Sequence, residues 1–248
     1  MGTKEIVEDM PDNNFTISYC IPCMNRTHHL KKVMPSIIEA ANYSPPVEIL
    51  VLDYNSTDDI DEYMASLRSV QLAEGNDITY LKYSKNKYYH MAHARNMVSL
   101  AARGKYLVET CVEVYLGKHF FSNIREEINR SKYKWLRFYS KKPSGIYAGI
   151  IVIEKEEFIE AGGYDERFEL YGPEDRELNS RLERRGIKSR TINSTYLHPY
   201  TSSDEEKTKN YRLKLTKRQM VEKMIPYYEE SVKNKALEVN RGVKWGQH

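Results

Sequence analysis

The chain has 248 residues, 40% of them hydrophobic and 29% charged, which is enough apolar sequence to bury a substantial core. Its 38 basic and 35 acidic side chains leave a net charge of +3, too small an excess to require nucleic acid or a membrane as a partner. No stretch approaches the roughly 18–20 apolar residues that span a bilayer, and the charged N-terminus lacks the pattern of a signal peptide, so we expect a cytoplasmic protein without a transmembrane segment.

Strands and helices are expected to alternate as far as residue 115. After a polar segment over residues 1–14, apolar runs predict strands, and apolar residues at helical spacing predict helices. The expected strands cover 15–22, 47–52, 78–83 and a stretch from 106, and the expected helices cover 27–42, 58–67 and 93–102. This alternation predicts an α/β fold with a mostly parallel sheet and helices on both faces. Ligands bind at the carboxyl ends of such strands, so we expect the chemistry in the loops after Ile21, Leu52 and Val108.

The second half of the chain changes character. Strands are expected at 135–139, 149–153 and 189–193, and helices at 155–161 and 176–185. We therefore expect one domain over residues 15–202. Residues 203–248 are highly charged and predict a helical extension, with a helix from about 215 to 236 that Pro226 kinks or breaks.

The three cysteines, Cys20, Cys23 and Cys111, are an odd number and form no disulfide framework. Cys20 and Cys23 have the CxxC spacing of a zinc site, but the sequence lacks a second pair of such ligands. We interpret the cysteines as small buried or loop residues.

Polar side chains follow the first two predicted strands. Asp53, Asn55 and Ser56 stand in the second of these loops, where a carboxylate followed by amide and hydroxyl groups can hydrogen-bond a base and a ribose. Turns and helix caps use the same residues, so this cluster does not by itself define a ligand site. The segment His93-Ala-Arg-Asn96 then opens a predicted helix, and residues 104–108 lead into the fourth strand.

Together these segments resemble the donor-binding half of glycosyltransferase family 2 and its relatives with the GT-A fold. In that family the order is strand-Pro-x-x-Asn-Arg, strand-Asp-x-x-Ser-x-Asp, Ala-Arg-Asn and Gly-x-Tyr-strand. The resemblance implies that Arg95 lies near the base or the pyrophosphate, where a fixed cation suits negative charge. It also implies that five residues surround the nucleotide: Pro22, Arg26, Asp53, Asn55 and Ser56. A UDP-sugar is the family's commonest donor and is the donor we expect.

A second block, residues 161–178, resembles the Gly-Gly-Phe-Asp-Glu … Trp-Gly-x-Glu-Asp segment of family 2 and of the galactosyltransferase-type C-terminal region. An inverting sugar transfer needs a base that takes the proton of the acceptor hydroxyl. The resemblance implies that Asp175 is this base and that Glu174 holds an acceptor or donor-sugar hydroxyl. It also implies that Tyr171, in place of the usual Trp, stacks on a sugar face.

Some residues of this block also have structural interpretations. Without the resemblance, Glu174 and Asp175 would be an acidic pair that the helix dipole favours at a helix N-terminus. Gly162 and Gly163 allow a close backbone approach. For Arg181, in the same predicted helix, a structural salt bridge and a phosphate contact both stay open.

The metal motif is where the sequence departs from the family. The Asp-x-Asp motif of the GT-A fold aligns with Cys111-Val-Glu113, so a soft thiol stands where the family has a carboxylate. Glu113 can supply a carboxylate to a hard divalent cation, Mn²⁺ or Mg²⁺. His198 falls where related enzymes place a histidine ligand of the metal, and a structural role for His198 is an equal alternative. Either Glu109 or Glu113 holds the metal, or metal binding is weakened, or the position was altered by engineering.

The resemblance predicts a hexosyltransferase, which moves a sugar from a nucleotide-sugar donor to a glycan or another hydroxyl acceptor with inversion. Two alternatives stay open. Residues 207–223 hold seven Lys or Arg against one Glu, which fits a solvated helix face but also an anionic acceptor such as modified DNA. The altered Cys111 position would also suit a non-catalytic relative that binds a nucleotide sugar or a glycan.

Overall fold

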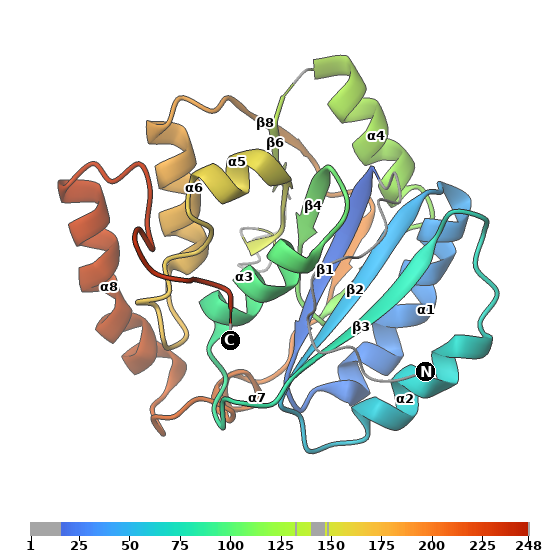
Figure 1. Ribbon diagram of the computed structural model, residues 1–248, viewed down its shortest axis with the longest axis horizontal. Helices are drawn as coiled ribbons and strands as arrows, with labels where there is room; N and C mark the ends of the chain where they lie inside the picture. Colours follow the sequence, from blue (N-terminus) through green and yellow to red (C-terminus); the bar gives the residue numbers. More distant parts are fainter. Residues whose placement is uncertain (1–15, 132, 140–146, 148, 248) are drawn as a thin grey trace.

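The computed structural model of the chain describes residues 16–131, 133–139, 147 and 149–247 (Figure 1). The polar segment expected over residues 1–14 lies outside these residues, as does the first residue of the strand expected over 15–22. Within the described part of the chain, no helix is both long enough and apolar enough to cross a membrane.

A seven-stranded sheet in the order β3-β2-β1-β4-β7-β6-β8 forms the centre of the molecule. Four neighbouring strands are parallel: β1 (Ile17–Cys23), β2 (Val47–Tyr54), β3 (Asp77–Tyr83) and β4 (Tyr106–Glu109). Three more strands extend the sheet past β4: β7 (Ile151–Glu154), β6 (Trp135–Tyr139) and β8 (Ser189–Asn193). Strand β7 is antiparallel to both β4 and β6, and β8 is parallel to β6. The prediction of an α/β fold with a mostly parallel sheet is confirmed.

Helices cover both faces of the sheet, because the buried strands send alternate side chains into two apolar cores. In β2, Val47, Ile49 and Val51 belong to one core, and Leu50 and Leu52 belong to the other. The first core also contains α1 (Thr27–Tyr43), α2 (Ile60–Ser66) and α4 (Phe120–Ser131). The second core also contains α3 (Met91–Ala101), α5 (Lys155–Glu160), α6 (Glu174–Arg184) and α8 (Lys217–Lys233).

Smaller elements complete the described fold. They are the 3-10 helix η1 (Leu67–Ser69), the short helix α7 (Asp204–Thr208) and an antiparallel pair, β5 (Val114–Leu116) and β9 (Leu197–Pro199). Neither this pair nor α4 is among the elements expected from the sequence. In α4 the buried residues Phe120, Phe121, Ile124 and Ile128 stand at helical spacing, which is the signal that would have predicted it.

Helix α8 runs through Pro226, which corrects the expectation of a break there. Proline lacks the N–H that would bond the carbonyl oxygen of Glu222 one turn earlier. Both Pro226 and Glu222 are exposed, so water can bond that oxygen in place of the missing N–H. The solvent-facing position therefore makes the proline tolerable.

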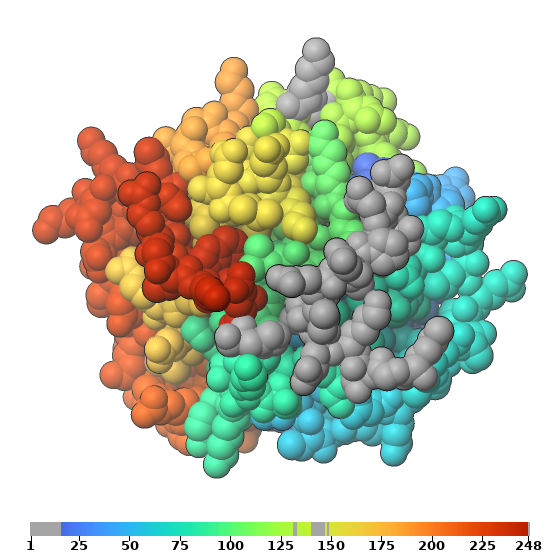
Figure 2. All heavy atoms as spheres, in the orientation of Figure 1, coloured from blue at the N-terminus to red at the C-terminus, as the bar shows by residue number. Residues whose placement is uncertain are grey.

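The C-terminal residues return across α3 and α5, where Figure 2 shows them in red against the elements coloured green and yellow. Asn240 Nδ2 donates to the carbonyl oxygens of Gly162, at 2.8 Å, and Tyr164, at 2.7 Å. Gly162 and Gly163 have φ values of 81° and 66°, in the left-handed region. A Cβ atom at Gly162 would lie 2.2 Å from the carbonyl oxygen of Val239. The close approach that these glycines permit is therefore made by the chain's own C-terminal segment.

We expect Gly162→Ala to destabilise the protein more than Gly186→Ala, with the difference measured by thermal unfolding. Both glycines have similar φ values, 81° and 79°, so both substitutions carry the cost of about 1–2 kcal/mol for a left-handed alanine. At Gly162 the new methyl group meets another part of the chain, which adds roughly 1–3 kcal/mol to the loss of stability. At Gly186 no other part of the described chain comes within 4 Å of the Cβ position, so this cost is missing. Equal losses of stability would contradict the packing assigned to residues 239–246.

Candidate active site

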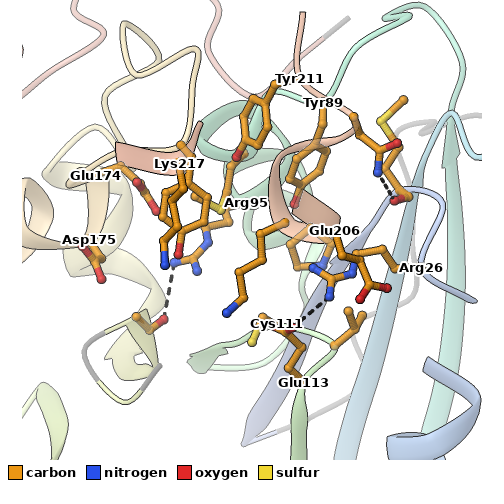
Figure 3. A pocket seen from close by; sticks show the side chains of 18 of the residues that line it. Arg26, Tyr89, Arg95, Cys111, Glu113, Glu174, Asp175, Glu206, Tyr211 and Lys217 are labelled. Carbon is orange, nitrogen blue, oxygen red and sulfur yellow. Dashed lines mark hydrogen bonds and ion pairs between the residues drawn. The ribbon is translucent and has the colours of Figure 1, made fainter. Parts of the chain in front are cut away.

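A cavity of about 430 Å³ opens at the carboxyl ends of β1 and β4, where ligands bind in parallel sheets (Figure 3). The loops after these strands, the first turns of α3, α6 and α8, and α7 form its wall. The residues predicted from the sequence that line this cavity are Pro22, Arg26, Arg95, Cys111, Glu113, Tyr171, Glu174 and Asp175. The structure thus brings together segments that lie far apart in the chain.

The acidic pair stands at the N-terminus of α6. Glu174 is 3% exposed, and its Oε2 atom has no hydrogen-bond partner among the described residues. Burial raises the pKa of Glu174, the negative charge of Asp175 raises it further, and Arg95 opposes both effects. Burial also raises the pKa of Asp175, against the opposing charge of Arg95. The two carboxyl groups therefore titrate as a pair and hold a proton at a pH where ordinary carboxyl groups have lost it.

Arg95 supplies the positive charge beside this pair. It lies in α3, is 6% exposed, and donates from Nη1 to the hydroxyl of Tyr164 at 2.9 Å. Its guanidinium carbon is 5.1 Å from the centre of the Tyr164 ring. A Cβ atom at Gly149 would lie 3.5 Å from both Arg95 Nη2 and Asp175 Oδ2, so the glycine leaves room where these two charges approach each other.

Arg26 and Glu113 form an ion pair on the opposite side of the cavity, as Figure 3 shows. Arg26 Nη2 donates to Glu113 Oε1 at 2.8 Å and to Ser202 Oγ at 2.9 Å. Ser202 Oγ in turn donates to the same carboxylate oxygen. Burial would raise the pKa of Glu113, but the hydrogen bond from Ser202 and the charge of Arg26 outweigh it and lower the pKa. Glu113 is therefore ionised and already neutralised by the protein itself.

The residues at the Asp-x-Asp position do not fit a hard divalent cation. Burial raises the pKa of the Cys111 thiol, so it stays protonated at neutral pH and is a poor ligand for Mn²⁺ or Mg²⁺. Oε1 of Glu113 is engaged by Arg26 and Ser202. Within the described part of the chain, Cys111 and Glu113 belong to no group of three ligand atoms lying within 4.8 Å of one another.

The other two residues considered for the metal do not line the cavity. Glu109 is fully buried, burial raises its pKa to about 7, and Ser99 donates to it. His198 is exposed on β9, opposite Tyr115 of β5. A cation shared by Glu113 and His198 thus has no preformed site among the described residues.

The cluster after β2 lies beside the cavity, outside its lining. Asp53 accepts from the backbone N–H of Ser56 at 2.7 Å, and Ser56 Oγ accepts from the N–H of Asn25 at 2.9 Å. Asn55 takes a left-handed φ of 61° and donates from Nδ2 to the carbonyl oxygen of Asn86 at 2.9 Å. These bonds tie the loops after β1 and β2 together. A contact of Asp53, Asn55 or Ser56 with a nucleotide stays a prediction.

Sequence reasoning missed the residues that the C-terminal extension adds to the cavity, which are Asp204, Glu206, Lys207, Asn210, Tyr211 and Lys217. Tyr211 packs edge-on against Tyr89, with ring centres 5.7 Å apart, and Lys217 Nζ lies 5.1 Å from the centre of the Tyr171 ring. The basic run over residues 207–223 was the available signal. Its spacing could not show that Lys207 and Lys217 turn inward.

Two parts of the chain match known protein families. Residues 18–109 match the family described as glycosyl transferase family 2, and residues 130–205 match the one described as N-terminal domain of galactosyltransferase. No curated protein sequence matches the chain.

Solved structures with the same fold include three glycosyltransferases. TarS of S. aureus in complex with UDP-GlcNAc has a TM-score of 0.62 and 14% identity, over 76% of this chain and 59% of that one. The mannosyltransferase PcManGT of Pyrobaculum calidifontis, with GDP-Man and Mn²⁺, has a TM-score of 0.59 and 16% identity, over 78% and 60%.

The third is the glucosyl-3-phosphoglycerate synthase of Mycobacterium tuberculosis, with Mn²⁺, UDP and phosphoglyceric acid. Its TM-score is 0.57 at 14% identity, over 77% of this chain and 73% of that one. This chain thus spans less than two thirds of the TarS fragment and of PcManGT. At these identities the structures establish the fold alone, and each of the two family matches covers less than half of the chain. The chain has the fold of these glycosyltransferases, and it is similar over residues 18–109 to glycosyl transferase family 2 and over residues 130–205 to the N-terminal domain of galactosyltransferase.

Proposed function

We propose that this enzyme transfers a sugar from a nucleotide-sugar donor, a UDP-sugar in the first instance, to an acceptor hydroxyl in one inverting displacement. The observation that carries the proposal is the Glu174–Asp175 pair, of which Glu174 is buried and Asp175 half-buried. The pair lines a cavity of donor size, with Arg95 beside it. The similar structures contain UDP-GlcNAc, GDP-Man and UDP, which supports a nucleoside diphosphate donor without fixing its base.

In this mechanism Asp175 is the general base. Its carboxylate takes the proton of the acceptor hydroxyl while that oxygen attacks the anomeric carbon, and the bond from that carbon to the diphosphate breaks. Raising the pKa of a carboxylate makes it a stronger base, provided that it stays ionised at the working pH. The unpartnered Oε2 atom of Glu174 accepts a hydrogen bond from a hydroxyl group of the donor sugar or the acceptor. The ring of Tyr171, which also lines the cavity, stacks on one face of a sugar.

Side chains meet the negative charge of the leaving diphosphate. Four cationic residues line the cavity, and because Arg26 is paired with Glu113, the residues left to face the diphosphate are Arg95, Lys207 and Lys217. Fixed cations lower the barrier when they face the position where charge develops, and they act there without a metal ion. Because Cys111 and Glu113 do not fit a divalent cation, the proposed mechanism uses side chains alone to stabilise the leaving group.

We also propose that residues 203–248 belong to the catalytic unit. Glu206, Tyr211 and Lys217 come from this extension and line the cavity. Lys207 and Lys217 turn toward the cavity, and Arg218 pairs with Glu222 in its own helix at 2.8 Å. The basic run thus has a role without nucleic acid, and no observation on the described residues favours modified DNA as the acceptor.

Asp175→Asn should lower the rate of sugar transfer by roughly 10²–10⁴-fold with little change in UDP affinity, because the amide cannot accept the proton. Glu174→Gln is the matched variant and should act mainly on KM, because the amide oxygen still accepts a hydroxyl. The measurement is steady-state transfer with calorimetry of UDP binding. If the two variants exchange these phenotypes, Glu174 is the base; if Asp175→Asn is stable and fully active, the mechanism is wrong.

The acid limb of the pH–rate profile should reflect the environment of Asp175. Activity requires the ionised carboxylate, so kcat/KM rises with pH through its pKa, which burial places above the usual value of about 3.9 for aspartate. Arg95 lowers this pKa, so Arg95→Gln should move the limb to higher pH, and Arg95→Lys should largely restore it. A limb that moves to lower pH in Arg95→Gln would contradict the assignment.

UDP affinity tests the predicted nucleotide loop. We expect Asp53→Ala to weaken UDP binding several-fold in calorimetry, because Asp53 closes the strand end where the family binds the nucleotide. Asp59→Ala removes the same charge from an exposed position paired with Lys31 and is the control. If a folded Asp53→Ala variant binds UDP with unchanged affinity, the residues after β2 do not bind the nucleotide and have only the structural role shown by their hydrogen bonds.

A further inference from the structure

We propose that His28, His29 and Glu206 form a transition-metal site at the rim of the cavity, separate from the Cys111–Glu113 position. The two histidines belong to the first turn of α1 and Glu206 to α7, so an ion here would connect two segments 177 residues apart. The site itself is independent of the proposed function, but its effect on the donor rests on that function.

The three side chains converge on one point. Nε2 of His28 and Nε2 of His29 each lie 2.6 Å from Oε1 of Glu206, and the two ring centres are 4.2 Å apart. Among the described residues, this is the one group of three His, Cys, Asp or Glu ligand atoms that all lie within 4.8 Å of one another. Bonds of 2.0–2.1 Å at tetrahedral angles place ligand atoms about 3.3 Å apart, so a small outward shift would admit an ion.

A hydrogen bond to Tyr200 fixes the ring of His29. The hydroxyl of Tyr200 lies 2.5 Å from His29 Nδ1 and 3.4 Å from the carbonyl oxygen of Val112. The other ring nitrogen, Nε2, is thereby directed at Glu206. Histidines that bind metals usually have such a fixed partner on their second ring nitrogen.

The ligand set specifies the class of ion. Two imidazole nitrogens and one carboxylate oxygen suit Zn²⁺ or Co²⁺, whereas Mg²⁺ prefers oxygen ligands. Three protein ligands leave a fourth position for water. The expected occupant is therefore a first-row transition metal of the Zn²⁺ type.

The position of Glu206 gives the site a consequence for the cavity. Glu206 and its neighbour Lys207 both line the cavity wall, and Figure 3 shows Glu206 next to Arg26. An ion held by α1 would fix α7, which is only five residues long, and with it the cation of Lys207. Metal binding should therefore preorganise this wall for an anionic donor.

The test uses the full-length, tag-free protein after treatment with a chelator that is then removed. Titration with Co²⁺, followed by its visible absorption, should show one equivalent bound, which Zn²⁺ displaces. Glu206→Gln and His29→Ala should each weaken Co²⁺ binding at least tenfold, and Tyr200→Phe by roughly 10–100-fold, because it removes the partner of Nδ1. His119→Ala, an exposed histidine elsewhere, and Glu113→Gln should leave the affinity unchanged.

Two results would overturn the proposal: no stoichiometric Co²⁺ or Zn²⁺ binding, or loss of binding in Glu113→Gln rather than in Glu206→Gln. Zn²⁺ should also raise the Tm of the wild type but not that of Glu206→Gln. This comparison distinguishes a variant that has lost the metal site from one that is only less stable. UDP binding is measured on the same samples. Co²⁺ binding without UDP binding would refute a UDP-sugar donor and leave the metal site in place.

Discussion

The buried ion pair between Glu177 and Arg181 is the interaction on which the wall of the candidate active site depends. Both side chains are 0% exposed. Arg181 bonds Glu177 and also donates to the carbonyl oxygens of Ala161 and Gly163, while Ser231 of α8 donates to Glu177 Oε1 at 2.6 Å. A buried pair is tolerated when its remaining hydrogen-bonding capacity is used in this way. The structural alternative for Arg181 therefore holds.

This network fixes the direction in which α6 presents its acidic residues. Glu174, Glu177 and Arg181 follow the spacing i, i+3 and i+7, so they lie on one face of the helix. The face that is anchored by Arg181 continues, one turn earlier, into the cavity wall. Removing the anchor would free α6 to rotate, and the raised pKa values of Glu174 and Asp175 would fall as water reached them.

How far the sequence predicts the structure depends on the range of the interactions. Strands β1 and β2 are local, continuous apolar runs, and the alternation with helices gives the parallel half of the sheet. The antiparallel insertion of β7 has no local signal, because its pairing with β4 brings together residues more than 40 positions apart. Helix α4, in contrast, has a local signal in the helical spacing of its buried apolar residues.

The residues of the candidate site also differ in whether local sequence predicts them. The Glu-Asp pair and Arg95 sit in short motifs with a recognisable order, and the structure brings them to one cavity. Lys217 and Tyr211 could not be placed, because their positions depend on how the extension folds back over the domain. Gly162 and Gly163 belong to the recognised motif as well, yet the neighbour they accommodate is the C-terminal segment, which the motif does not include.

The first turn of α1 collects carboxylates from distant parts of the chain. This turn contains no acidic residue, and the helix dipole leaves it with partial positive charge. Carboxylates come to it from elsewhere: Asp58 accepts from the N–H of Thr27 at 2.9 Å, Glu113 from Arg26, and Glu206 lies against the two histidines. Arg26 thus neutralises Glu113 within the protein, next to the Cys111 thiol, whose pKa burial raises.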